Sequence, residues 1–105
     1  MWNQREIRQK PAKPSVEEAE LLAIQAVEWL LGDEEISMRF LALSGMTADM
    51  LAGAVAAQDH EFLGGVLDFV LNNEPDLVAF AQAREMAPER VVTLRRLLGG
   101  AQDWG

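Results

Sequence analysis

The sequence contains no cysteine and no tyrosine, and its only histidine is His60. Without cysteine, the chain cannot form disulfides or use thiolates as metal ligands or nucleophiles. A single histidine gives no metal-ligand spacing, because a metal site needs further ligands from elsewhere in the fold. We therefore expect no cofactor and no metal, and we interpret His60 as an exposed side chain in the first turn of a helix.

Long apolar runs are also lacking. No stretch approaches the roughly 18 consecutive apolar residues that a membrane-spanning helix needs. The basic N-terminus is followed by Pro11, Lys13 and Pro14, where a secretory signal would have its apolar segment. We accordingly expect no transmembrane segment and a cytoplasmic location.

Familiar catalytic patterns are missing as well. The sequence has no Gly-rich phosphate loop and no G-x-S-x-G elbow. Ser15 and Thr47 are explained as helix caps, while Ser37, Ser44 and Thr93 have no nearby base in the sequence. We predict a non-enzymatic protein. An enzyme of unrecognised type stays open, since two carboxylates that are distant in sequence can meet in a folded cleft.

Basic residues are scarce, with nine Lys and Arg against seventeen Asp and Glu. Residues 1–14 nevertheless carry a net charge of +3, whereas residues 15–105 hold five basic and sixteen acidic residues, a net of −11. An acidic body repels the phosphate backbone, so we do not expect the folded part to bind nucleic acid. The basic arm is either a solubilising tail or a contact for nucleic acid, an acidic lipid surface or an acidic protein surface. Its basic residues are Arg5, Arg8, Lys10 and Lys13.

The sequence is rich in signals that start and stop short helices. Ser15, Asp33, Thr47 and Asp59 each precede an apolar-periodic run, as N-caps do. Glycine follows several of these runs, and proline stands where the last two helices would begin. The signals predict helices over residues 15–31, 34–43, 47–57 and 60–71, then a fifth from Pro75 and a sixth from Ala87–Pro88. Glu18, three residues after Ser15, completes the spacing of a capping box.

Helices this short, joined by links of a few residues, cannot lie side by side as a long bundle. We therefore predict an all-α fold, a compact orthogonal bundle of five to six short helices. The predicted domain covers residues 15–99, between a mobile basic arm (1–14) and a frayed tail (100–105).

The fourth predicted helix, residues 60–71, is apolar around more than half of its circumference and should be central. Gly64–Gly65 in its interior conflicts with helix propensity, because each glycine costs about 1 kcal/mol relative to alanine. Close approach of another helix is the favoured explanation, and a functional kink is the alternative. In the second predicted helix, we expect Ile36, Phe40 and Leu43 to face inward.

Two groups of residues are candidates for structure or binding. Arg39 and Asp68 both border apolar stripes, and we predict that they form a structural ion pair across the second and fourth helices. A second set of apolar side chains is not needed on inner faces and is a candidate interaction surface. Its members are Leu21, Leu22, Trp29, Met38 and Met50.

With these residues in view, the chain resembles a family of short alphaproteobacterial proteins classified as a domain of unknown function, number three-five-seven-two. The resemblance spans roughly residues 15–98. It implies a small cytosolic helical protein and brings no assigned activity, cofactor or catalytic residue. The residues that carry it are Arg39-Phe40-Leu41-Ala42-Leu43-Ser44-Gly45, Asp59, Phe62-Leu63, Val66-Leu67-Asp68-Phe69, Leu71, Glu74, Leu77 and Phe80-Ala81.

The function that these observations favour is protein interaction. We predict a module that binds another protein, or its own copy, through apolar residues near Trp29 and Met38. The alternative is an accessory role at nucleic acid or a membrane surface, carried by the basic arm.

Overall fold

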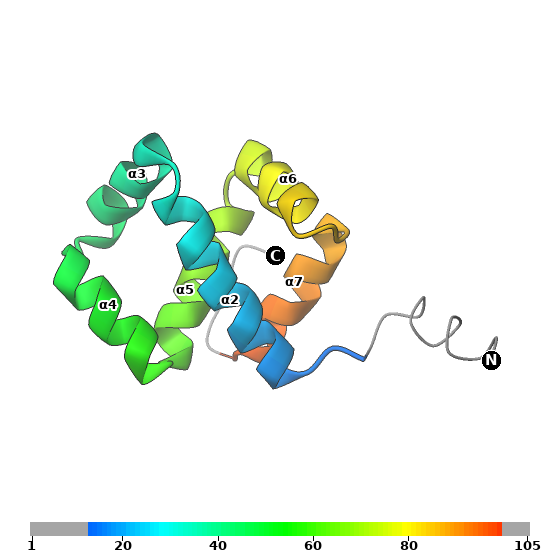
Figure 1. Cartoon of the computed structure of the whole chain (residues 1–105). Helices are drawn as coiled ribbons and strands as arrows, with labels where there is room; N and C mark the ends of the chain where they lie inside the picture. The colour runs from blue at the N-terminus through cyan, green and yellow to red at the C-terminus, as the bar shows by residue number, and fades with distance from the viewer. Residues whose placement is uncertain (1–12, 100–105) are drawn as a thin grey trace, which may run out of the picture.

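The computed structural model of the chain describes residues 13–99. Six α-helices and no strand lie within this range, as the all-α prediction requires (Figure 1). The predictions made for residues 1–12 and 100–105 fall outside the described residues. The helices are α2 (Val16–Leu31), α3 (Glu34–Ser44), α4 (Ala48–Ala57), α5 (His60–Leu71), α6 (Glu74–Ala83) and α7 (Pro88–Leu97).

Side-chain caps begin five of these helices. Ser15, Asp33, Thr47 and Asp59 each accept a hydrogen bond from a backbone N–H of the first turn, which confirms the four predicted caps. Asn73 caps α6 in the same way, so this helix begins at Glu74, one residue before the predicted start at Pro75. The helix α7 instead begins at proline, whose fixed φ suits a first helical turn.

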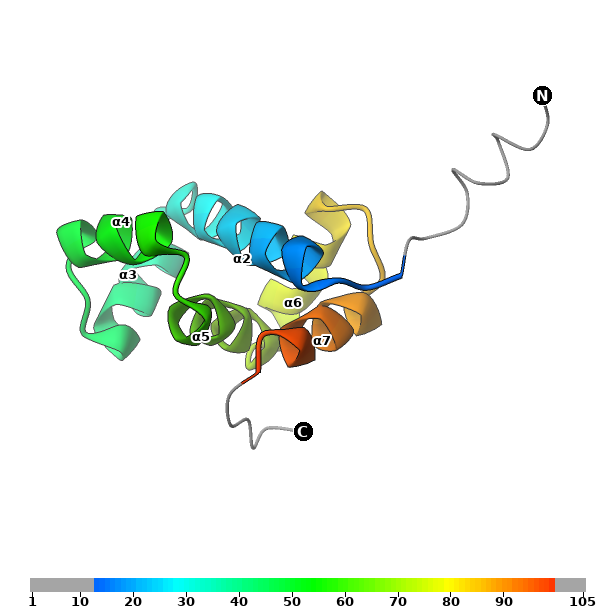
Figure 2. The ribbon, with the colours of Figure 1, turned by 90° about the horizontal axis from the view of Figure 1, so that it is seen from below.

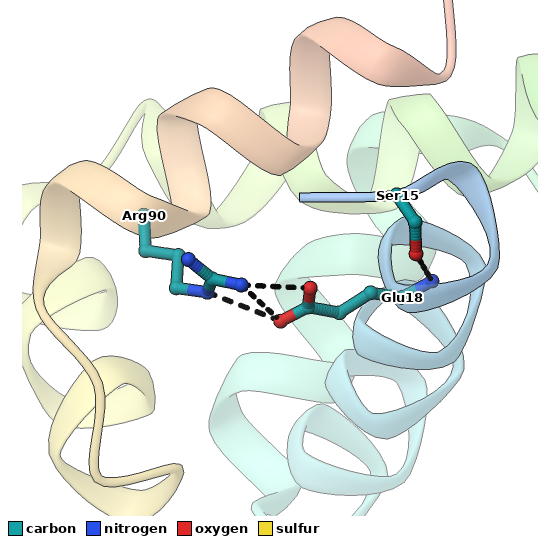
Figure 3. Close-up of polar contacts among 3 residues, drawn as sticks. All are labelled: Ser15, Glu18 and Arg90. Carbon is teal, nitrogen blue, oxygen red and sulfur yellow. Dashed lines mark hydrogen bonds and ion pairs between the residues drawn. The ribbon is translucent and has the colours of Figure 1, made fainter. Parts of the chain in front are cut away.

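The predicted capping box is only half formed. Ser15 accepts from the Glu18 backbone N–H at 3.1 Å, but the Glu18 carboxylate turns to Arg90 of α7 (Figure 3). The Arg90 Nη2 atom lies 2.8 and 2.9 Å from the two carboxylate oxygens, and Nε adds a bond of 3.1 Å. Such a charge-assisted, forked contact is stronger than a bond to one backbone N–H, and it ties α2 to α7.

The helix α5 occupies the centre, as predicted, and packs on α2, α4, α6 and α7. In Figure 1, α2 crosses in front of α5, with α3 and α4 on one side and α6 and α7 on the other. Figure 2 shows α2 lying over the layer that α5 and α7 form. Fully buried side chains at this centre are Leu30, Leu63, Val66, Leu67, Val70, Phe80, Val91 and Leu94.

The helices α3 and α4 bury far less. Each has one buried residue, Phe40 in α3 and Leu51 in α4. The expectation that Leu43 faces inward is wrong, because its side chain is 74% exposed. In the described part of the chain no single helix meets the length and hydropathy needed to span a membrane, whereas α3 and α4 meet them only jointly, as a pair bent by 84°.

Candidate functional site

A pocket of about 350 Å³ lies between α3 and α5. The last turns of α3 form one side of it, and the second half of α5, with the turn that follows, forms the other. Its lining residues are Arg39, Phe40, Leu43 and Ser44 of α3, Gly65, Asp68 and Phe69 of α5, and Asn72 and Asn73.

Two aromatic rings build the apolar wall of this pocket. Phe40 and Phe69 meet edge to face, with their centroids 5.1 Å apart and their planes at 85°. The Arg39 guanidinium carbon lies 5.2 Å from the centroid of the Phe69 ring, within the range of a cation–π contact. The charged Arg39 side chain and the two apolar rings therefore lie side by side in the lining of the pocket.

Arg39 and Asp68, the predicted ion pair, each have a charged partner on a helix that the prediction did not include. Both residues line the same pocket, but Arg39 bonds to Asp76 in the first turn of α6. Asp68 bonds to Arg95 of α7, with 2.7 Å between Arg95 Nε and Oδ1 and 3.0 Å between Nη2 and Oδ2. The prediction included only α3 and α5, whereas α6 and α7 each bring a charged group to the same place.

Arg95 was not among the residues predicted for a site or an ion pair. Its side chain is 5% exposed, and its Nη1 atom also donates to the Gly99 carbonyl oxygen at 2.7 Å. The signal was present, because Arg95 follows Val91 by four residues and lies within the apolar stripe of α7. A charged residue at a core position of a helix predicts a buried partner.

The two adjacent glycines of α5 play different roles. A Cβ atom on Gly64 would lie 2.9 Å from the Arg95 Cζ and Nη1 atoms, so the missing side chain makes room for the guanidinium. The predicted close approach of another helix is thus met at Gly64 only by the end of an α7 side chain. A Cβ atom on Gly65 would meet nothing within 4 Å, and Gly65 lines the pocket.

The structure separates the five residues of the candidate interaction surface. Leu22 does not belong to a surface, because it is 2% exposed and lies in the core. Trp29 is half-buried and packs on Phe80, with a ring separation of 5.4 Å. Leu21, Met38 and Met50 are exposed, at 55%, 62% and 54%, on α2, α3 and α4 respectively.

His60 is exposed in the first turn of α5, as expected. Its Nε2 atom lies 2.5 Å from Glu20 Oε2, so it joins α5 to α2. Within residues 13–99, no group of three or more His, Asp or Glu side chains is placed to hold a metal ion. The candidate site is thus the α3–α5 pocket, an apolar recess whose two charged lining residues, Arg39 and Asp68, are bonded to other helices.

The comparison with known families decides which family this domain represents. A family model described as "Protein of unknown function (DUF3572)" matches residues 16–101. The chain belongs to this family. The match covers the six described helices, so the α3–α5 pocket and the α3–α4 pair are parts of the DUF3572 domain itself. Searches of curated proteins and of solved structures find no match.

Proposed function

We propose that this DUF3572 protein is a binding module whose contact helices are α3 and α4. The observation that carries the proposal is the composition of α3. Met38 and Leu43 lie about 140° apart around the helix axis at 100° per residue, and both are exposed. A helix that is apolar on most sides normally lies in a core. In α3, Phe40 is buried, and Ile36 and Leu41 are partly buried against the core. Met38 and Leu43 stay exposed, which supports a partner that covers these two.

The exposed apolar side chains continue onto α4, the helix that follows. Met50 there is 54% exposed, and Leu51 alone is buried. Methionine is flexible and polarizable, which suits a surface that adapts to the side chains of a partner. We name the three exposed side chains Met38, Leu43 and Met50 the α3–α4 surface.

The charges near the α3–α4 surface favour a cationic partner. Residues 33–58 hold four exposed acidic residues and one basic residue, Arg39, which is bonded to Asp76. A second copy would bring the same acids to the interface, and an anionic lipid surface would be repelled. We therefore propose that the partner is a protein segment that combines apolar side chains with Lys or Arg, and that it meets this module in the cytoplasm. The four acids are Asp33, Glu34, Glu35 and Asp49.

Fluorescence anisotropy with two designed peptides tests this proposal. The probe is an amphipathic peptide of leucine and lysine, and its control replaces lysine by glutamate. We expect the Leu/Lys peptide to bind and the Leu/Glu peptide not to bind. The double variant Met38→Ser with Met50→Ser should weaken binding about tenfold, because anchors at a binding surface carry most of the affinity.

The matched control is Val78→Ser with Leu97→Ser, which removes two exposed apolar side chains from α6 and α7. These substitutions should leave the affinity unchanged. Equal binding by both double variants contradicts the proposal. A concentration-dependent dimer in light scattering that the α3–α4 double variant abolishes also contradicts the proposal, because the occupant would then be a second copy. Adsorption to anionic vesicles that this variant abolishes contradicts it too, because the occupant would then be a membrane.

A further inference from the structure

We infer that the α3–α5 pocket receives one large apolar side chain, a ring or a branched aliphatic group, from the segment that binds the α3–α4 surface. The inference rests on the proposed function for the identity of the partner. Its own support is the pocket, and above all Gly65.

Gly65 is a helix residue that packing does not explain. Glycine is among the least favourable residues in a helix interior. At Gly64 the cost has a structural reason, because a Cβ atom would lie 2.9 Å from the Arg95 guanidinium. At Gly65 a Cβ atom would meet nothing within 4 Å, so any side chain there would extend into open space beside the pocket. The glycine therefore keeps the recess open.

The chemistry of the walls selects an uncharged apolar occupant. Phe40, Phe69 and Leu43 supply the apolar lining. The two charged lining residues are already bonded, Arg39 to Asp76 and Asp68 to Arg95. A charged group that entered the pocket would lose its hydration without gaining a free partner of opposite charge. A ring or branched chain gains burial against the two phenylalanines.

The pocket is continuous with the proposed contact helix. Leu43 is 74% exposed and lines the pocket, and it also belongs to the α3–α4 surface. A segment lying along α3 thus reaches the opening. The volume of about 350 Å³ is at the lower end of the range for ligand pockets, roughly 300–1,000 Å³.

A side chain of a partner suits this pocket better than a free small molecule. Small-molecule sites have a few polar groups that converge to fix the orientation of the ligand. Here most of the polar lining is engaged elsewhere. Arg39 and Asp68 are in ion pairs, and the Asn73 side chain accepts from the Asp76 backbone N–H at 3.0 Å, which leaves Asn72 and the buried Arg39 Nε atom. The partner backbone, held on α3, would provide the orientation instead.

Indole and toluene, the side chains of Trp and Phe without their backbones, are direct probes of the pocket. We would titrate each into the full chain and follow backbone amide shifts by NMR, with acetamide as a polar control. Indole should shift the amides of Gly65, Phe69 and Asn72, and acetamide should not. Gly65→Leu should weaken indole binding about tenfold by filling the recess. Gly65→Ala, which adds one methyl group, should have a smaller effect.

Gly53→Leu is the matched control, because Gly53 is also helical, has nothing within 4 Å of a built Cβ and does not line the pocket. It should leave indole binding unchanged. Neither leucine variant should lower the melting temperature. Indole binding that persists in Gly65→Leu, or shifts confined to other helices, overturns the inference.

The Leu/Lys peptide separates this inference from the proposed function. If both hold, Gly65→Leu weakens peptide binding about tenfold, as the Met38 and Met50 double variant does. Peptide binding that depends on Met38 and Met50 but not on Gly65 overturns the pocket inference alone. Indole bound in the pocket without any peptide binding overturns both, and it would identify a small-molecule site.

Discussion

The helices α2, α5, α6 and α7 and the pair α3 and α4 are built from the same local signals but are used differently. Both parts have capped helices of similar length. Yet every fully buried apolar side chain lies in the first part, and Phe40 and Leu51 are the only nearly buried ones in the second. Helix formation is therefore a poor guide to which helices stabilise this fold. Burial distinguishes the part that holds the domain together from the part that we propose to bind a partner.

Charged contacts reinforce the same division. Glu18 with Arg90 and Asp68 with Arg95 join helices within the first part. In the described range, the ion pair between Arg39 and Asp76 attaches α3 to α6 of the first part. The second part is thus attached by this ion pair, by one buried residue from each helix, by the chain connections at its two ends and by partly buried apolar side chains, which are Ile36, Leu41, Met46 and Val55.

The largest difference in stability between the two parts should come from a matched pair of leucine substitutions. Leu67→Ala in α5 removes a fully buried side chain and should lower the free energy of unfolding by about 2–5 kcal/mol. Leu43→Ala in α3 removes an exposed one and should change it by less than about 0.5 kcal/mol. Urea denaturation followed by circular dichroism measures both. A large loss for Leu43→Ala would show that α3 is part of the core and would remove the distinction.

Substitutions in two ion pairs, one buried and one exposed, should differ less in their effect on stability. Asp68→Asn leaves the Arg95 guanidinium, 5% exposed, without its charged acceptor and should cost about 2 kcal/mol. Glu20→Gln weakens the exposed contact with His60 and should cost less than about 1 kcal/mol. Equal midpoints in urea for the two variants would mean that Arg95 finds another acceptor, so that the Asp68 contact adds little to the first part.

The adjacent glycines should give small individual changes in stability, with opposite signs. Gly64→Ala forces the guanidinium of Arg95 to move although Asp68 and the Gly99 carbonyl hold it, so we expect a loss of about 1–2 kcal/mol. Gly65→Ala meets no neighbour and should gain up to about 1 kcal/mol of helix propensity. Thermal melts of both variants provide the test. Destabilisation by Gly65→Ala would show that Gly65 serves packing and would weaken the case for the pocket.

Local signals in the sequence predicted the helices well for a physical reason. A cap is decided by residues within one turn, so Ser15, Asp33, Thr47 and Asp59 could be recognised without knowledge of the fold. The central position of α5 could be inferred too, because a helix that is apolar over more than half its circumference needs neighbours on several sides.

The pairing of charges and the exposure of individual apolar residues could not be derived in this way. Arg39 and Asp68 border neighbouring stripes, but their partners Asp76 and Arg95 come from α6 and α7, whose placement is a tertiary property. Leu22 and Leu43 illustrate the same limit. Leu22 was predicted on a surface and Leu43 on an inner face, and the arrangement of neighbouring helices buries the first and exposes the second.

The route of the chain through α3 and α4 has a mechanical consequence. Gly32 and Asp33 connect α3 to α2, and Gln58 and Asp59 connect α4 to α5, so the excursion leaves and rejoins two helices that pack directly on each other. The pair α3 and α4 is therefore attached at both ends to the same packed pair of helices, α2 and α5. A force applied to α3 and α4 is thus shared by two anchored ends, and the proposed partner could bind there without displacing α2 and α5.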